Sequence, residues 1–211
     1  MIQPTRIVII DYNSGNLRSV FNAISSIKEK NQTVLISSNP QDLKTATHII
    51  LPGVGAFKDC AKGLKEVDGM VEEIKAQIKN KKPFLGICVG MQLLADIGYE
   101  HGKEEGLALI SGEVKKISDD DGKLKIPQIG WNNLEILSNH KILENIEAED
   151  HVYFVNSYMF EVKNKENILA QVSYGKNKIN AILVKDNIIA TQFHPEKSAK
   201  AGLQLLKNFI S

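Results

Sequence analysis

Short apolar runs recur along the first ninety residues, separated by longer segments of mixed character. Residues 7–10 (Ile-Val-Ile-Ile) are apolar at every position, which is typical of a strand buried on both faces of a parallel sheet. Similar runs predict three further strands, at residues 33–37, at residues 48–51 and directly after Pro83, where the run breaks at residues 86–90.

The segments between these runs carry apolar residues at helical spacing. Residues 17–30 predict an amphipathic helix, and residues 57–79 also predict helical structure. A third helix is expected after residue 88, as far as about Ile97, where Gly98 can end it. Strands that alternate with helices indicate an α/β fold with a doubly wound, largely parallel sheet flanked by helices.

The pattern changes after Gly98, where strand-like runs dominate, and we expect these antiparallel strands to extend the same sheet. Turn residues at 119–122 (Asp-Asp-Asp-Gly) predict a hairpin-type turn, and residues 185–187 predict another. An amphipathic helix is expected from Lys197 to Ile210. The expected runs are residues 107–117, 124–137, 152–162, 168–174 and 179–193.

The composition is that of an ordinary globular protein, with 43% hydrophobic and 24% charged residues among 211. The formal net charge of +1 gives no electrostatic reason to expect nucleic acid or a membrane surface as a partner. Only two cysteines occur, so we expect no disulfide scaffold. No secretory signal or membrane-spanning run is visible, so we expect a cytoplasmic protein with one domain, residues 1–211.

Residues 86–90 (Gly-Ile-Cys-Val-Gly) interrupt the fourth apolar run where a helix is expected to begin. Two glycines around one nucleophile allow a strand-to-helix turn that is too sharp for larger residues, as in a nucleophile elbow. The turn would raise the Cys88 sulfur above the sheet edge and aim a helix N-terminus at it, which favours the thiolate. The alternative is a buried structural cysteine in a glycine-rich turn.

A second candidate is residues 193–196 (Phe-His-Pro-Glu), at the end of an apolar strand, where parallel-sheet folds place their active residues. Glu196 lies two residues beyond His194 and can reach back to its imidazole, which would fix the tautomer and stabilise the protonated ring. Pairing with His194 would promote ionisation of Cys88. The alternative is a surface turn before the last helix.

The third candidate is residues 52–55 (Pro-Gly-Val-Gly), also at a strand end. Glycines there allow backbone N–H groups to face a ligand, as an oxyanion hole requires. One donor would be the Val54 N–H and the other the Val89 N–H, directly after the nucleophile. The alternative is a plain β-to-α turn. A phosphate loop is disfavoured, because the segment lacks a third glycine or a lysine at the required spacing.

Residues 51–55, 86–92 and 193–196 together resemble the motifs of class I (triad) glutamine amidotransferases, in order and spacing. The resemblance implies a flavodoxin-like sheet with added antiparallel strands in the C-terminal half. It runs from near the start to the final helix, and further stretches are similar to the glutaminase subunits of imidazole glycerol phosphate synthase: residues 11–20, 106–114, 126–132 and 153–158.

The resemblance implies a catalytic triad of Cys88, His194 and Glu196 acting on glutamine. Cys88 would attack the side-chain amide and form a thioester, while His194 would protonate the ammonia and then activate a water molecule. Glu196 would orient His194. The implied substrate-binding positions are Gly53, Gly55, Gln92, Glu100, Ser157 and Tyr158.

The resemblance also implies a partner. The ammonia would pass to a cyclase subunit with a (β/α)8 fold, in a heterodimer that serves histidine biosynthesis. The implied partner-facing residues are Asn16, Trp131, Asn132 and Lys197, although Trp131 is equally compatible with a core aromatic residue. Neither a cofactor nor a metal is implied.

Two positions depart from the family's pattern. Asn13 stands where glycine is usual, although Asn tolerates a positive φ better than most residues. Asn156 stands where histidine is common. These departures leave open a paralogous glutaminase that supplies another synthase, such as a sugar amidotransferase. Other interpretations are a cysteine hydrolase of peptides or other amides, a flavodoxin-like binding module, and a regulatory subunit without activity.

Overall fold

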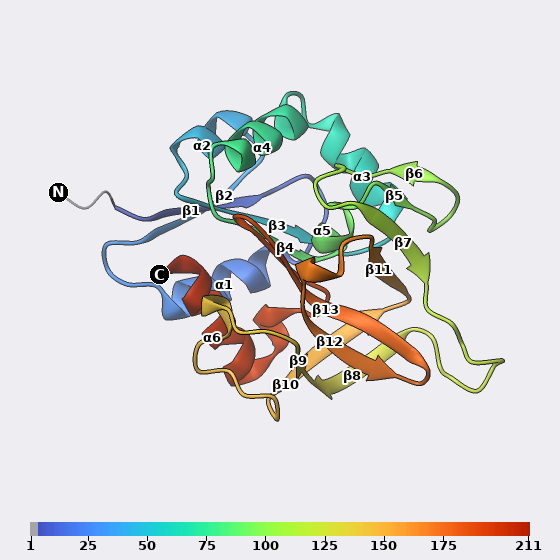
Figure 1. The fold of residues 1–211 in the computed structure, drawn as a ribbon. Coiled ribbons are helices and arrows are strands. Elements are labelled where there is room, and N and C mark those ends of the chain that lie inside the picture. Colours follow the sequence, from blue (N-terminus) through green and yellow to red (C-terminus); the bar gives the residue numbers. More distant parts are fainter. Residues whose placement is uncertain (1–3) are drawn as a thin grey trace.

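The computed structural model describes residues 4–211, and its central feature is an eight-stranded sheet (Figure 1). The strand order is β2-β1-β3-β4-β14-β13-β12-β9. Neighbours from β2 to β14 are parallel, and neighbours from β14 to β9 are antiparallel. The strands are β1 (Arg6–Ile10), β2 (Thr33–Ser37), β3 (His48–Gly53), β4 (Phe84–Cys88), β9 (Glu135–Ile136), β12 (Ile168–Tyr174), β13 (Asn177–Lys185) and β14 (Ile188–Thr191).

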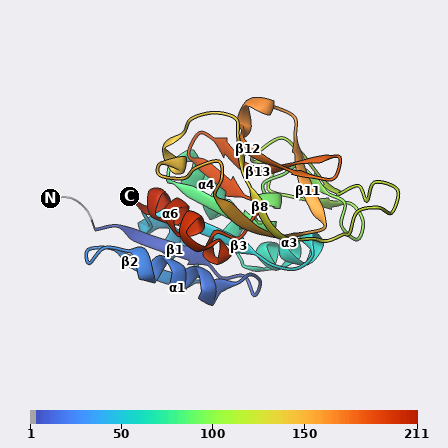
Figure 2. The ribbon, with the colours of Figure 1, turned by 90° about the horizontal axis from the view of Figure 1, so that it is seen from below.

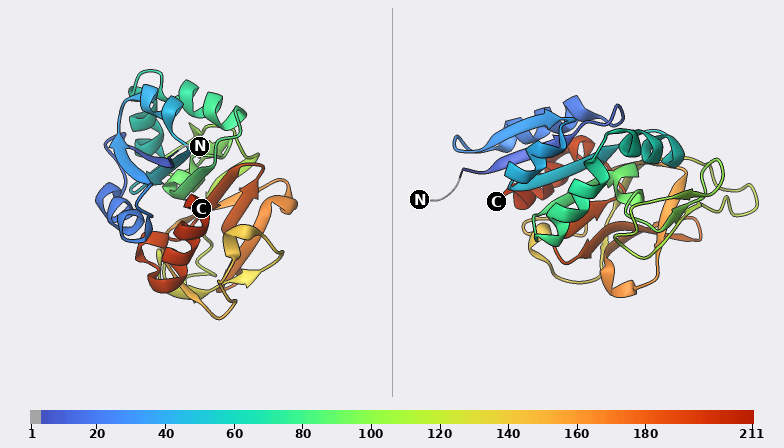
Figure 3. Two further views of the ribbon diagram at one scale, coloured as in Figure 1. Left: turned by 90° about the vertical axis from the view of Figure 1, so that its left-hand side faces the viewer. Right: turned by 90° about the horizontal axis from the view of Figure 1, so that it is seen from above.

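Helices cover both faces of the parallel part of this sheet. The pair α1 (Leu17–Ile27) and α6 (Ala199–Ile210) packs on one face, and these helices lie side by side in Figure 2. The other face carries α2 (Pro40–Thr45), α3 (Phe57–Glu66) and α4 (Met70–Lys79), as Figures 1 and 3 show. The expected α/β fold with a largely parallel sheet, flanking helices and added antiparallel strands is confirmed.

Two helical predictions need correction. The segment 57–79 is two helices, separated by a short turn at residues 67–69, and α2 was not expected. The helix after Cys88 is only α5 (Val89–Gln92), and Ile97 lies in a strand. The reason is tertiary: the Leu93 and Leu94 carbonyls accept N–H groups from Leu107 and Leu109 at 2.7 and 2.9 Å instead of continuing a helix.

The C-terminal half does not simply extend the central sheet, which is a second correction. Four of its strands join that sheet, but the others form two small sheets. The chain changes sheet at Ser157, because β10 pairs with β8 whereas β11 pairs with β7. The first small sheet is β8 (Gln128–Asn133) and β10 (His151–Asn156); the second is β11 (Tyr158–Val162), β7 (Gly112–Lys116), β5 (Ile97–Gly98) and β6 (Glu104–Glu105).

The two predicted turns behave differently. Residues 185–187 do connect the antiparallel neighbours β13 and β14, with Asp186 at φ 53°. Residues 119–122 do not form a hairpin turn, because β7 and β8 belong to different sheets. The Asp120 carboxylate instead accepts the Lys176 N–H at 2.8 Å, which ties this loop to the turn between β12 and β13.

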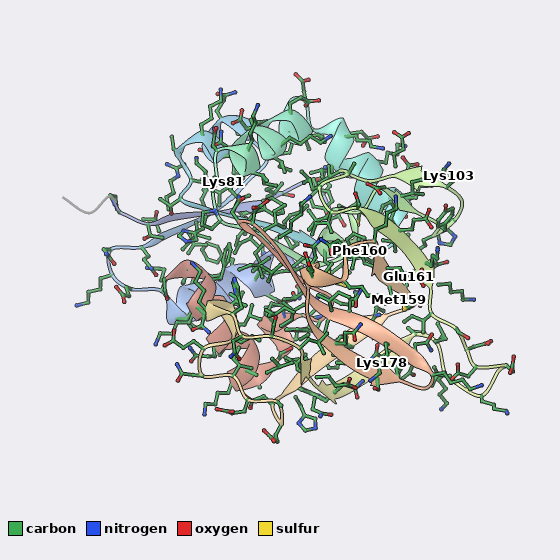
Figure 4. All side chains as sticks on the ribbon, viewed as in Figure 1. Lys81, Lys103, Met159, Phe160, Glu161 and Lys178 are labelled. Carbon is green, nitrogen blue, oxygen red and sulfur yellow. The ribbon has the colours of Figure 1, made fainter. Side chains whose placement is uncertain are left out.

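Polar and apolar positions alternate as the small sheets require. On β11, Phe160 is buried while its neighbour Glu161 is exposed, and Figure 4 labels both together with the exposed lysines Lys81, Lys103 and Lys178. Three short 3₁₀ helices complete the fold: η1 (Lys141–Leu143), η2 (Lys165–Asn167) and η3 (Pro195–Lys197). Among the helices of residues 4–211, none has both the length and the apolar character to cross a bilayer.

Candidate active site

Cys88 occupies a sharp turn between β4 and α5, in a backbone conformation that is rare for residues other than glycine. Its φ is 54° and its ψ is −111°. Such strain persists only where the surroundings enforce it, and it is common at reactive groups. The neighbouring glycines permit this turn, because a Cβ at Gly90 would collide with the Leu51 carbonyl and one at Gly86 would press on the Gly90 backbone. The structure therefore has the strand-to-helix elbow that the glycine spacing predicts.

His194 and Glu196 form a buried hydrogen-bonded pair beside the elbow. The His194 Nδ1 lies 2.8 Å from Glu196 Oε1, and the two side chains are 3% and 0% exposed. The backbone around His194 is fixed on both sides, since its N–H donates to the Tyr153 carbonyl and its carbonyl accepts the Ser198 hydroxyl. Because Nδ1 faces the carboxylate, Nε2 is left for the pocket, which Cys88 and His194 line together.

The environment of His194 favours the protonated ring. Burial by itself lowers the pKa of His194, but the hydrogen bonds and negative charges of Cys88 and Glu196 outweigh burial and raise that pKa from 6.5 to about 9. A protonated imidazole between a sulfur and a carboxylate is the arrangement of an activated cysteine nucleophile.

The Pro-Gly-Val-Gly turn adjoins the elbow, because Gly53 at the end of β3 pairs in register with Cys88. Within residues 4–211, no backbone hydrogen bond engages the N–H of Val54 or of Val89. Both residues line the pocket that contains Cys88. Two free N–H groups beside a nucleophile have the composition of an oxyanion hole.

Side chains from the β1–α1 loop and from α3 hold this turn from behind. The Ser14 hydroxyl donates to the Val54 carbonyl at 2.8 Å, and the Cys60 thiol lies 3.6 Å from the same oxygen. The Tyr12 hydroxyl donates to the Pro52 carbonyl at 2.7 Å. Sequence reasoning missed these contacts; the only signal was the strong turn chemistry of residues 11–16, where Asn13 does take a positive φ of 61°.

A pocket of about 250 Å³ opens over these groups. It brings together nine of the predicted residues, whereas Gly53 and Glu196 do not line it. Pro127, Val155 and Asn156 also line it, and of these only Asn156 had drawn attention in the sequence, as a departure from the family pattern. The predicted lining residues are Val54, Gly55, Cys88, Val89, Gln92, Glu100, Ser157, Tyr158 and His194.

Two further polar side chains have defined partners. The Gln92 amide nitrogen donates to the Tyr158 carbonyl at 3.2 Å and to Gln192 Oε1 at 3.0 Å. Glu100 Oε2 accepts the Phe57 N–H at 2.7 Å, so this carboxylate also satisfies the first turn of α3. Sequence reasoning gave no role to Gln192, whose only signal was its place two residues before His194.

The predicted partner-facing residues lie outside the pocket lining. Trp131 on β8 is 49% exposed and packs edge-on against Tyr153, so it is not a core aromatic residue. Lys197 is exposed and Asn132 is half-buried. Asn16 is half-buried too, and its amide nitrogen lies 3.5 Å from Glu196 Oε1, next to the catalytic pair.

Residues 4–211 hold no cluster of three or more His, Cys, Asp or Glu side chains that could bind a metal. The aspartates of residues 119–121 lie in a loop in which Asp120 and Asp121 have positive φ. These residues are half-buried or exposed, as in a solvated turn.

Comparison with solved structures shows the same architecture at low sequence identity. PurLQS from Thermotoga maritima superposes with a TM-score of 0.72 at 17% identity, covering 98% of this chain and 97% of that chain. A glutamine amidotransferase from the same organism gives a TM-score of 0.62 at 21% identity, covering 94% of this chain and 79% of that chain. These similarities support the fold.

Sequence comparison is more specific. Residues 8–211 match the family described as glutamine amidotransferase class-I. The imidazole glycerol phosphate synthase subunit HisH of Pelagibacter ubique is 42% identical over 206 residues, covering 97% of this chain and 99% of the relative. The protein of the same name from Bradyrhizobium diazoefficiens is 46% identical over 211 residues, covering 97% of each. This chain therefore belongs to the class I glutamine amidotransferase family, among its HisH subunits.

Proposed function

We propose that this chain is the glutaminase subunit of an imidazole glycerol phosphate synthase. It hydrolyses glutamine to glutamate and ammonia, and a cyclase partner uses the ammonia in histidine biosynthesis. The observation that carries the chemistry is the strained Cys88 beside the buried His194–Glu196 pair. The observation that favours this synthase over another is the 42–46% identity to HisH subunits over nearly the whole chain.

The reaction has two halves. Cys88 Sγ attacks the carbonyl carbon of the glutamine side chain, so a C–S bond forms and the carbonyl oxygen becomes an oxyanion held by the Val54 and Val89 N–H groups. When the oxyanion collapses, the C–N bond breaks and protonated His194 gives its proton to the departing ammonia. Neutral His194 then takes a proton from water as the water oxygen attacks the thioester carbon. The C–S bond breaks, glutamate is released, and the Cys88 thiolate is restored beside protonated His194.

Gln92 and Glu100, which line the pocket, recognise the substrate. Gln92 Oε1 accepts no hydrogen bond within residues 4–211, so it is free to accept an N–H of the substrate. Glu100 Oε1 is likewise free to accept from the α-ammonium group, because Phe57 engages only Oε2. Ser157 and Tyr158, where the chain passes from β10 to β11, line the same pocket next to Gln92, whose amide donates to the Tyr158 carbonyl.

The partner in this proposal is a (β/α)8 cyclase that binds as a heterodimer over Trp131, Asn132, Asn16 and Lys197. Trp131 packs on Tyr153, whose carbonyl accepts the His194 N–H. The proposed interface is therefore separated from the catalytic histidine by one residue. The short distance along the chain of contacts from Trp131 to His194 supports the proposal that binding of the cyclase changes the glutaminase activity.

The test is glutamate release from glutamine, measured with and without a purified cyclase partner and its nucleotide ligand. Strong stimulation by the cyclase is expected, because uncoupled hydrolysis wastes glutamine and one oxyanion donor, the Val54 N–H, lies on a turn between two glycines. Cys88-dependent turnover that ignores the cyclase would overturn the pathway and favour a different synthase. Absence of turnover under both conditions would overturn the glutaminase itself.

A further inference from the structure

Gln192 connects the nucleophile to the substrate-binding amide through a chain of buried hydrogen bonds. Its side chain is fully buried on the segment between β14 and His194. Gln192 Oε1 accepts the Gln92 amide at 3.0 Å, and Gln192 Nε2 lies 3.8 Å from Cys88 Sγ, within hydrogen-bonding reach of sulfur. Its backbone N–H donates to the Ala181 carbonyl at 2.9 Å, so the residue is fixed at both ends.

The direction of this chain follows from its outer end. A backbone carbonyl only accepts hydrogen bonds, so the Tyr158 oxygen requires that Gln92 turn its NH₂ group inward. The second N–H of that group then meets Gln192, which must offer its oxygen. Gln192 is left with its NH₂ group toward the sulfur of Cys88. A donor aimed at sulfur stabilises a thiolate in preference to a thiol.

We propose that Gln192 is a further catalytic residue, which donates a hydrogen bond to the Cys88 thiolate before substrate attack. It is at the same time a positioning residue for Gln92, because it helps to hold the Gln92 carbonyl oxygen toward the pocket, where that oxygen accepts an N–H of glutamine. The second role rests on the proposed function. The first does not, because it concerns only the reactivity of the sulfur.

The competing explanation is that Gln192 merely fills buried space. The two explanations predict different results for isosteric replacements. Methionine matches the length of glutamine and lacks the donor, so Gln192→Met keeps most of the packing and removes the hydrogen bond. Glu matches the shape even more closely but places a carboxyl group against the sulfur, where its negative charge opposes a thiolate.

The experiment measures alkylation of Cys88 by iodoacetamide between pH 5 and 9 without glutamine, with mass spectrometry to separate Cys88 from Cys60. In Gln192→Met we expect alkylation at pH 7 to slow roughly tenfold and its pH profile to move to higher pH. A tenfold effect is what the loss of one hydrogen bond to a charged group is expected to cause. Gln192→Glu should be slower still. The matched control is Gln171→Met, because Gln171 also donates to a side-chain amide, at 2.8 Å, but lies outside the pocket.

An unchanged Cys88 pH profile in both Gln192 variants would overturn the proposal. Circular dichroism and thermal unfolding establish that each variant is folded, and Gln192→Glu retains the test if the methionine variant does not fold. With the cyclase and its nucleotide present, the positioning role predicts a higher KM for glutamine in Gln192→Met, and an unchanged KM would contradict that role. If the unaltered protein shows no glutaminase activity, the proposed function fails while the alkylation result still decides the role of Gln192.

Discussion

At the scale of single residues, the site depends on buried polar groups that are held by hydrogen bonds, although Glu196 Oε2 and Asn156 Oδ1 have no partner within residues 4–211. His194 is held by Glu196 on one ring nitrogen and faces Cys88 with the other. Gln192 reaches the same sulfur from another side. In a buried setting each of these contacts is stronger than it would be in water. If one partner is removed, the other is left as a buried polar group without a hydrogen bond, which destabilises the protein.

The first prediction concerns the nucleophile. Cys88→Ala should abolish glutamine-dependent synthesis, because no other thiol lines the pocket that contains Val54 and Val89. The cyclase complex should still form product when ammonium salts are supplied, which serves as the control for an intact complex. Both rates can be followed by product formation. Retained glutamine hydrolysis in the variant would show that the nucleophile is another group.

The second prediction follows from the raised pKa of His194. Because that pKa is about 9 in the folded protein against 6.5 ordinarily, the folded state binds a proton more tightly than the unfolded state. The resulting stability is complete below about pH 6.5 and is lost as the pH rises through 9. Relative to His194→Gln, the native chain should therefore lose up to about 3 kcal/mol of unfolding free energy between pH 6 and 10. Denaturant titrations across this range measure it, and a pH-independent difference would contradict the pKa.

The third prediction concerns the support of the oxyanion turn. Ser14→Ala removes the hydroxyl that holds the Val54 carbonyl at 2.8 Å. The turn should then sample orientations in which its N–H groups miss the oxyanion, so kcat should fall about two- to tenfold with little change in KM. Ser26→Ala is the matched control, since Ser26 also donates to a carbonyl, that of Ala23 on α1, away from the pocket. Equal kcat values for the two variants would argue against the support.

At the scale of elements, the sequence predicted those strands and motifs whose structure depends on residues close together in the chain. Apolar runs located β1, β3 and β4 because burial on both faces leaves a continuous signal in the sequence. The three motifs were visible because each joins a reactive group to glycine or proline within a few residues. The support of the Val54 turn by Ser14 was not predictable, since it joins residues forty positions apart.

The short helix α5 shows the same limit. Its apolar residues continue at helical spacing beyond Gln92, yet the carbonyls of Leu93 and Leu94 bond to residues 107–110. A competing partner from a distant segment overrides local propensity, and only the folded chain reveals it. The expectation that all C-terminal strands extend the central sheet was wrong for a similar reason. The strands before and after Ser157 pair with different partners, β8 and β7, which lie elsewhere in the sequence.

The fourth prediction tests the packing of the elbow. Gly90→Ala should destabilise the protein by about 3 kcal/mol, because the added methyl group would collide with the Leu51 carbonyl on β3, a backbone atom that cannot move independently. The control is Gly122→Ala, where a Cβ meets nothing within 4 Å and only the positive φ of 78° is unfavourable. Chemical denaturation compares them. Similar losses in the two variants would mean that β3 and α5 are less closely packed than the structure indicates.

At the scale of the whole molecule, the central sheet carries the reactive groups at the carboxyl ends of its parallel strands. Cys88 ends β4, Gly53 ends β3 and His194 follows β14, so three neighbouring strands converge on one pocket. The small sheet of β8 and β10 lies against this edge, since the Tyr153 carbonyl on β10 accepts the His194 N–H. Its exposed side is where the apolar residues Ile129 and Trp131 emerge, at 62% and 49% exposure.

The fifth prediction follows from this arrangement. Ile129 and Trp131 are two positions apart on β8 and so point to the same face, where a partner can bury them. Large aromatic residues of this kind often dominate binding, so Trp131→Ala should weaken cyclase binding at least tenfold, measured by calorimetric titration. Thermal unfolding of the isolated chain should change little, since half of the side chain is already in water. Leu137→Ala is the control, because Leu137 is 54% exposed but follows β9, which belongs to the central sheet and not to the sheet of β8 and β10. If both variants bind the cyclase equally well, the partner must dock elsewhere, and the short route from interface to His194 would lose its role in activation.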